Sequence, residues 1–299
     1  MATDYHTNVH ALGVDVGGTH LCSAVIDIAA GTLCTEPLRT PVDSNASASE
    51  IVKAWASNVR SSLSLFGGEV AGIGFAFPGP FDYDRGVSLI RGVCKYESVY
   101  GLKIRESLLP PAGIESIPCR FVNDASAFAL GEALHGAAKG ADRVVALTLG
   151  TGVGSGFVAD GKLVTSGEGV PENGWVYCLP FGDSIADDAF STRWIVKRYG
   201  ELTGQRVAGA REVAERYAQD EAARQLFDEY GTRLAEFLLP VLSAFGSRSV
   251  VLGGNISRAY NLFSASLERT LAGCGMPVDV KVSSLMDNAA MIGAASLFL

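Results

Sequence analysis

Apolar and polar positions along the chain follow two periods, one typical of strands and one typical of helices. Residues 47–66 carry an apolar side chain every four positions, at Ile51, Trp55, Val59 and Leu63, and the run ends at a glycine pair. This period predicts an amphipathic helix. The apolar run at 70–82 predicts a buried strand that ends in a Pro/Gly turn, and residues 116–136 predict a strand, FVND, followed by a helix whose first turn carries Asp124. The alternation of strands and helices favours an α/β architecture.

A glycine pair separates two apolar runs in residues 12–28, LGVDVGGTHLCSAVIDI. Such a pair between β-rich runs is typical of a tight hairpin turn. Asp15 near the end of the first run, and the Thr19 hydroxyl beside exposed backbone amides, also suit a magnesium-bound phosphate. Taken alone, the stretch is compatible with a plain hairpin and with a phosphate loop.

The same plan recurs about 130 residues later, in VVALTLGTGVGSGFVADG (144–161), as a strand, a Gly/Thr turn and a strand. A third glycine pair follows an apolar strand in SVVLGGNIS (249–257). A duplicated unit whose phosphate loops face each other explains the first two turns together, and three such turns can line one cleft. Two independent hairpins remain the alternative.

Length and charge limit the classes of protein that this chain can belong to. At 299 residues it is long enough for two lobes, since single cores stop growing near ~250–300 residues. The net charge of −8, with acidic and basic residues interspersed, argues against nucleic acid as a partner. No apolar run reaches the ~18 residues of a membrane span, and MATDYHTNVH does not resemble a signal peptide. We therefore expect a cytoplasmic protein without a membrane partner.

Other common sites are disfavoured by residue spacing. The six cysteines (Cys22, Cys34, Cys94, Cys119, Cys178 and Cys274) are scattered without a CxxC pair, and three of the four histidines (His6, His10 and His20) lie near the start without metal-ligand spacing. The glycines at 152–156 do not match the dinucleotide fingerprint GxGxxG. GFVADGKL (156–163) resembles a P-loop, but Leu163 replaces the required hydroxyl residue.

Five segments together carry a resemblance to a known family. GVDVGGTH (13–20) resembles the first phosphate motif of the ROK family of sugar kinases, which belongs to the sugar kinase, Hsp-type ATPase and actin superfamily. FVNDASAFALGE (121–132) resembles its catalytic strand and helix, and LTLGTGVGSGFVADGKL (147–163) its second phosphate motif. SVVLGGNIS resembles the adenosine motif, and DNAAMIGAASLF (287–298) the closing helix.

The resemblance implies an actin-like ATPase fold in which two α/β lobes, built from duplicated ribonuclease H-like units, enclose a central cleft. We expect the first lobe to span 1–120 together with the last helix, 287–299, and the second lobe to span 121–286. The implied activity is ATP-dependent phosphorylation of a hydroxyl of a hexose or amino sugar with Mg²⁺. The resemblance also implies a homodimer. Which sugar, which hydroxyl and which phosphate donor are left open.

The resemblance also assigns roles to individual residues. Asp124 would be the general base, with a plain helix cap as its structural alternative. Sugar contacts would come from Asn123 and Glu172, and also from Gly79 unless it is only a turn glycine. Asp15 would hold Mg²⁺, directly or through water. Donor phosphates would face Gly17, Gly18, Thr19, Gly150, Thr151 and Gly152, and adenosine would face Gly253 and Gly254.

Residues 171–195 depart from the family, in which a histidine and three cysteines bind a structural zinc beside the sugar. Here Trp175 stands at the histidine position and Cys178 alone represents the cysteines, so we expect no zinc. Trp175 could stack on a sugar face or, as we favour, fill the missing metal site by packing. Asp187 lies near the position of a further sugar-binding glutamate and is a candidate for that role.

Two non-enzymatic functions were considered against the kinase. Repressors of the same family carry a helix-turn-helix domain before the first phosphate motif, and the dozen or so residues ahead of Asp15 are too few for one. A catalytically weak or inactive sugar sensor of the same fold is the alternative, because loss of the zinc motif can accompany loss of activity. The retained Asp15, Asn123 and Asp124 favour the kinase.

Overall fold

The computed structural model describes residues 9–93, 95–275 and 277–299, so that His6 and Cys94 lie outside the described residues. The chain forms two compact units. Unit 1 contains residues up to Gly131 together with Asp287–Leu299, and unit 2 contains Glu132–Met286. The division expected from the sequence put residues 121–131 in the second lobe. They lie in unit 1 because strand β8 (Cys119–Asn123) pairs in parallel with β5 (Ile73–Phe77).

Unit 1 is built on one sheet with strand order β3-β2-β1-β5-β8, in which β4 also pairs with β2. Its other strands are β1 (His10–Val16), β2 (His20–Asp27), β3 (Thr32–Leu33), β4 (Leu38–Pro41) and the small pair β6 (Phe81–Asp82) and β7 (Val87–Ser88). Its helices are α1 (Ala48–Phe66), α2 (Ile104–Ala112), α3 (Asp124–Leu134), which crosses the unit boundary, and α10 (Ala289–Ala295), with short 3-10 turns at Glu97–Val99, Met286–Asn288 and Ser296–Phe298.

The helix predicted from the four-residue period is α1, and its ends are fixed by local chemistry. The Ser47 side chain and Glu50 form a capping box at the N-terminus, and Gly67 ends the helix in the left-handed conformation at φ 66°. Its apolar face buries Trp55, which meets Phe77 of β5 edge to face at 5.3 Å. The sequence prediction of this helix is confirmed.

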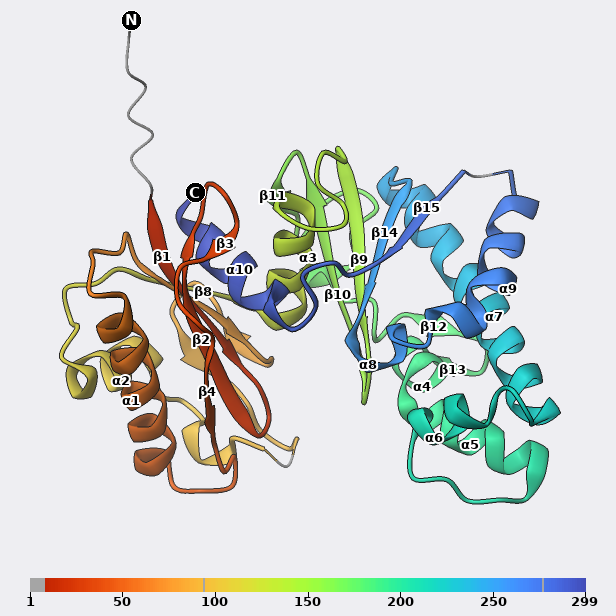
Figure 1. Ribbon diagram of the computed structural model, residues 1–299, viewed down its shortest axis with the longest axis horizontal. Coiled ribbons are helices and arrows are strands. Elements are labelled where there is room, and N and C mark those ends of the chain that lie inside the picture. Colours follow the sequence, from red (N-terminus) through yellow and green to blue (C-terminus); the bar gives the residue numbers. More distant parts are fainter. Residues whose placement is uncertain (1–8, 94, 276) are drawn as a thin grey trace, which may run out of the picture. The chain divides into compact units, whose positions relative to one another are not determined.

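The two faces of the unit 1 sheet are covered differently, by α1 and α2 on one side and by α10 on the other (Figure 1). In β1, Leu12 and Val14 belong to the apolar cluster that includes α1 and α2. Gly13 points to the other face, where an added Cβ would lie 2.1 Å from the Met291 carbonyl oxygen of α10. Asp15, two residues further along β1, shares this face, since side chains alternate along a strand.

Unit 2 repeats this arrangement with strand order β11-β10-β9-β14-β15. The strands are β9 (Arg143–Leu149), β10 (Val153–Ala159), β11 (Lys162–Leu163), β14 (Ser249–Gly253), β15 (Asp279–Val282) and the small pair β12 (Pro180–Phe181) and β13 (Ser184–Ile185). The helices are α4 (Ala186–Phe190), α5 (Thr192–Thr203), α6 (Ala210–Arg216), α7 (Glu221–Phe245), α8 (Gly254–Ser257) and α9 (Tyr260–Gly273), with a 3-10 turn at Glu172–Gly174.

The two sheets have the same topology. In each, the first and second long strands form an antiparallel hairpin, and the first also pairs in parallel with the next long strand. The duplication expected from the two Gly/Thr turns is therefore present in the strand connections.

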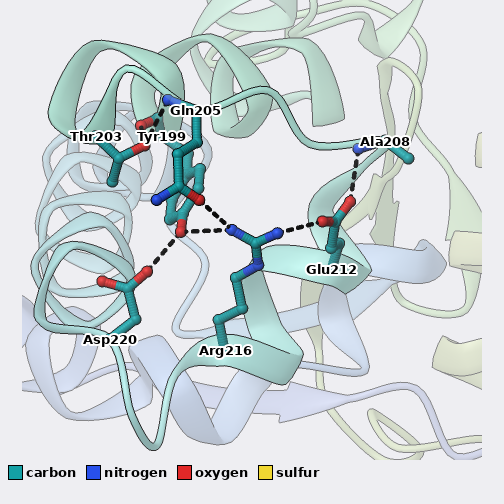
Figure 2. Close-up of polar contacts among 7 residues, drawn as sticks. All are labelled: Tyr199, Thr203, Gln205, Ala208, Glu212, Arg216 and Asp220. Atoms are coloured by element: carbon teal, nitrogen blue, oxygen red, sulfur yellow. Dashed lines mark hydrogen bonds and ion pairs between the residues drawn. The ribbon is translucent and has the colours of Figure 1, made fainter.

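A polar network ties α5, α6 and the start of α7 together (Figure 2). Arg216 donates to the Tyr199 hydroxyl at 2.9 Å and to Gln205 Oε1 at 2.8 Å, and it also pairs with Glu212. The Tyr199 hydroxyl donates to Asp220, which caps α7 by accepting the Ala222 N–H. This network holds the C-terminal end of α5 in place.

Candidate active site

The first glycine turn closes the β1–β2 hairpin. The Gly17 N–H donates to the His20 carbonyl at 2.9 Å. Within the described residues, the N–H groups of Gly18 and Thr19 donate to no protein acceptor. Unpaired amides in a tight turn are typical of anion-binding concavities. The stretch is thus a hairpin that also leaves donors for a phosphate.

The Thr19 hydroxyl has a protein partner. Its Oγ1 lies 3.1 Å from His20 Nδ1, and Arg39 Nη2 lies 3.2 Å from the same ring nitrogen. Because the guanidinium can only donate, Nδ1 is the acceptor and the ring is neutral. Burial, followed by the Arg39 charge, lowers the pKa of His20, which agrees with this assignment.

Asp15 is half-buried on the sheet face that α10 covers. Burial raises its pKa to about 7, and the nearby charges of Asp124 and Asp287 add to the shift. Like charges raise the pKa of a carboxyl group, and a cation beside Asp15 would oppose both that repulsion and the cost of burial. A carboxylate oxygen is a hard donor of the kind that Mg²⁺ prefers.

Asn123 and Asp124 stand where β8 ends and α3 begins. Asn123 Oδ1 accepts the N–H groups of Ala125 and Ser126, each at 3.1 Å, so Asn123 is the residue that caps the helix. Asp124 is half-buried next to the cap. Burial raises the pKa of Asp124, while the Ala125 N–H and the Lys95 charge partly offset that rise. Asp124 Oδ1 also accepts the Ala125 N–H, at 2.9 Å, so the two side chains share the first amide of the helix.

The Pro/Gly turn after β5 reaches Asn123 through a tyrosine that sequence reasoning missed. Tyr83 donates its hydroxyl to the Phe77 carbonyl at 3.1 Å and accepts from Asn123 Nδ2 at 3.2 Å. A Cβ on Gly79 would lie 3.5 Å from the same hydroxyl. Gly79 and Asn123 are therefore brought together around Tyr83, and a hydrogen bond from the Asn123 side chain also partly lowers the pKa of Asp124.

Two charged residues near this group were also missed. Lys95 Cδ lies 3.9 Å from the position of a Cβ on Gly18, and the Lys95 charge acts on Asp124. The next residue, Tyr96, donates its hydroxyl to the Gly17 carbonyl at 2.6 Å. Asp287 acts on Asp15 from the start of the segment that leads into α10. Only the position of Asp287 at the head of the closing-helix motif could have drawn attention to it.

In unit 2, the turn Gly150–Gly152 joins β9 to β10. The Gly150 N–H donates to the Gly152 carbonyl at 3.0 Å. Gly254 begins α8 at φ 79°, and a Cβ there would lie 2.4 Å from the Leu149 carbonyl oxygen. The packing of α8 on the end of β9 thus requires this glycine, whatever nucleotide approaches it. Gly253 pairs with Thr148, so both glycines lie beside the turn.

The segment that departs from the family lies along β10. Glu172 is exposed in a 3-10 turn, and Ser155 Oγ anchors that turn by donating to the Gly174 carbonyl at 2.6 Å. Trp175 is half-buried and meets the ring of the exposed Tyr177 at 6.0 Å, and it is not part of the unit 2 core cluster in the described residues. Whether Trp175 fills the missing metal site by packing or stacks on a sugar stays a prediction.

Asp187, the other uncertain residue, directs its carboxylate to the second glycine turn. Its Oδ1 accepts the Val153 N–H at 2.7 Å, and its Oδ2 accepts from Arg193 at 2.5 Å. Both carboxylate oxygens thus have protein partners within unit 2.

In the described part of the chain, no group of three or more His, Cys, Asp or Glu side chains is placed to hold a metal ion. A magnesium ion near Asp15 would therefore take most of its ligands from water and from phosphate oxygens, as Mg²⁺ commonly does. No described helix combines the length and apolar character needed to cross a membrane.

Comparison with known proteins gives consistent relatives. A glucokinase from Thermotoga maritima is 28% identical, with 96% of this chain and 96% of the relative covered. An N-acetyl-D-glucosamine kinase from Mannheimia succiniciproducens is 26% identical over 96% of this chain and 98% of its own. The crystal structure of a ROK family glucokinase from Streptomyces griseus, in complex with glucose and AMPPNP, matches with a TM-score of 0.73 at 23% identity, covering 96% of this chain and 98% of that one.

The structural match confirms the actin-like ATPase fold expected from the sequence. The family model for ROK matches residues 11–299, which is nearly the whole chain. Together with the paired glycine turns and the Asn123-Asp124 helix start described above, this coverage shows that the chain belongs to the ROK family.

Proposed function

We propose that the protein is a sugar kinase that transfers the γ-phosphoryl group of ATP to a hydroxyl of a hexose or amino sugar. The observation that carries the proposal is the start of α3, where a half-buried Asp124 with a raised pKa lies near Asp15 and Lys95. The glucokinase relative, similar over 96% of both chains, supports the substrate class. Phosphoryl transfer needs positioning, charge neutralisation and a proton acceptor, and these residues can supply all three.

Asp124 is the general base in this proposal. It takes the proton of the attacking sugar hydroxyl as that oxygen bonds to the γ-phosphorus, while the bond from this phosphorus to the β–γ bridging oxygen breaks and ADP leaves. A raised pKa makes the carboxylate a better proton acceptor. The Lys95 charge opposes part of the rise in the Asp124 pKa, because it favours the charged form.

Asp15 holds Mg²⁺ in this proposal, through water or directly, and the ion neutralises charge on the phosphates. The unpaired amides of Gly18 and Thr19 bind phosphate oxygens in unit 1. In unit 2 the turn Gly150–Gly152 binds phosphate, and Gly253 and Gly254 line the adenosine site.

Sugar recognition is assigned to the Asn123 amide, Gly79 and Glu172. Asn123 contacts a sugar hydroxyl in this proposal from beside the base, since its amide hydrogen-bonds to both Tyr83 and Asp124 while its oxygen caps α3. Glu172 is exposed and can accept from sugar hydroxyls. The half-buried Trp175 ring offers an apolar face on which a sugar can stack.

We also propose that residues 171–195 fold without zinc and that the chain forms a homodimer. Protein contacts support a fold without zinc, since the Ser155 hydroxyl donates to the Gly174 carbonyl and accepts the Val176 N–H, and β12 pairs with β13. Elemental analysis should find less than one zinc per chain, and one zinc per chain would overturn the proposal that the segment folds without zinc. Sedimentation equilibrium tests the dimer.

The activity is tested by ADP release from Mg-ATP across a panel of hexoses, ketoses and N-acetylated amino sugars. Wild type should turn over with at least one sugar. Asp124→Asn should keep sugar binding, measured by calorimetry, but lose about 10²–10⁴-fold in kcat. Asp142→Asn, a matched change at an exposed carboxylate in unit 2, should leave kcat unchanged. Sugar binding without turnover in wild type would instead favour the sensor.

A further inference from the structure

Every carbonyl of the second glycine turn has a protein donor. The Thr192 N–H and hydroxyl donate to the Gly150 carbonyl at 2.8 and 3.0 Å. Arg193 Nη1 donates to the Thr151 carbonyl at 2.7 Å. The Gly152 carbonyl accepts the Gly150 N–H within the turn. Thr192 and Arg193 are the first residues of α5, so this helix start holds the backbone of the turn.

The N–H groups of the turn, unlike its carbonyl groups, are mostly without a protein partner. In the described residues, those of Thr151 and Gly152 donate to no protein acceptor. All three carbonyl oxygens of the turn are therefore occupied, while two of its three N–H groups, those of Thr151 and Gly152, have no acceptor in the described residues. A phosphate needs this polarity, because carbonyl oxygens facing it would repel it.

Asp187 completes the arrangement at the start of β10. Its Oδ1 accepts the Val153 N–H at 2.7 Å, and a Cβ on Gly152 would lie 2.9 Å from this oxygen. The absence of a side chain at position 152 thus lets the carboxylate reach the backbone. An unpaired carboxylate here would repel a phosphate, but Arg193 Nη2 lies 2.5 Å from Oδ2 and compensates its charge.

We propose that Asp187 and Arg193 are positioning residues for the donor phosphates, and that Asp187 is not a sugar ligand. The inference rests on the proposed kinase function and deepens it. Arg193 has two roles, since it fixes the Thr151 carbonyl and cancels the Asp187 charge. Losing Arg193 alone therefore does more harm than losing Asp187, whose amide replacement in Asp187→Asn still accepts the Val153 N–H.

The test measures KM for ATP, KM for sugar and kcat in five variants, one of which is Asp187→Asn alone. Arg193→Gln should raise KM for ATP about tenfold, the equivalent of one charge-assisted hydrogen bond, and leave KM for sugar unchanged. Arg193→Lys, which keeps the charge, should lie between Arg193→Gln and wild type. Adding Asp187→Asn to Arg193→Gln should move KM for ATP back toward wild type. Arg198→Gln is the matched control, since this arginine lies on the same helix but pairs with Glu229 and Glu201.

Hydrogen exchange gives a readout that does not depend on turnover, because Arg193→Gln should speed exchange of the Val153 N–H. An unchanged KM for ATP in Arg193→Gln, or a larger effect of Asp187→Asn on KM for sugar than on KM for ATP, would overturn the inference. If wild type turns over no sugar, the kinase proposal fails, and calorimetry with Mg-AMPPNP then decides this one. Weaker nucleotide binding by Arg193→Gln would support it, and no binding by wild type would overturn it.

Discussion

The carboxyl group of Asp15 in unit 1 lowers the stability of the folded chain when it is ionised, because it is partly buried near other negative charges. Asp15 lies on a covered sheet face near Asp124 and Asp287, and its pKa is raised to about 7. A residue that cost stability without a compensating role would be easy to replace by a neutral one. The cost therefore supports a functional role for the charge at this position.

This cost can be measured in the metal-free protein. A folded pKa raised from 3.8 means that the folded chain loses stability as pH rises from about 4 to about 7. Asp15→Asn should therefore be more stable than wild type at pH 8 in EDTA, by up to about 4 kcal/mol at about 1.4 kcal/mol per pKa unit. The advantage should shrink at pH 5, when urea unfolding of both is compared. An Asn variant less stable than wild type at pH 8 would contradict the pKa assignment.

The site residues of unit 1 differ in how well the sequence alone predicts them. Asp15 and Asp124 stand next to recognisable strand ends and glycine turns, so their spacing indicated a site. Lys95 and Asp287 reach the same group from distant parts of the chain, and only the closing-helix motif, which begins at Asp287, marks either of them. Asn123 was expected to contact the sugar, and the sequence did not show that its oxygen also caps α3.

Among the secondary-structure elements, those with strong local signals were predicted well. Helix α1 has an apolar face, a capping box and a glycine stop, and its bounds follow from them. The strand at β8 and the helix after it were likewise predicted from FVND and the residues that follow. The short helices α4 and α6 have no side-chain N-cap and no glycine stop, and α6 is organised by contacts with other elements, such as the network around Arg216.

The hydroxyl of Tyr199 links two charged partners in that network, and its removal should weaken unit 2. Its bond to the Asp220 carboxylate lowers the pKa of Asp220, so this contribution is present above the unfolded value of 3.8 and is lost as pH falls below it. Tyr199→Phe should lower the urea midpoint by a constant amount between pH 5 and pH 8. Tyr217→Phe, a neighbouring change that removes no hydrogen bond in the described structure, is the control. A loss that grows steadily with pH across this range would contradict the mechanism.

At the scale of the whole molecule, the repeated glycine turns correctly indicated a duplicated architecture. The predicted boundary near residue 120 differs from the observed one because β8 pairs with β5 and so remains with unit 1. Sheet pairing of this kind depends on which strand lies next to which, and a hydrophobic pattern alone does not specify it.

Unit 1 depends on the last residues of the chain, and a truncation tests this. A chain that ends at Met286 lacks α10, so the sheet face that carries Gly13 and Asp15 loses its cover. Amides of β1 and β5 should exchange quickly in this chain, while those of β9 and β14 should keep their protection. Equal protection of both sheets would show that α10 is dispensable.

The same feature has a consequence for synthesis on the ribosome. Unit 2 is complete once Met286 has emerged, whereas the sheet of unit 1, although made first, waits for residues 289–295. Translation at roughly 5–20 residues per second puts many seconds between the two ends of unit 1. During that interval the nascent chain exposes the face that α10 will later cover, and a chaperone that recognises apolar surface has its best opportunity to bind there.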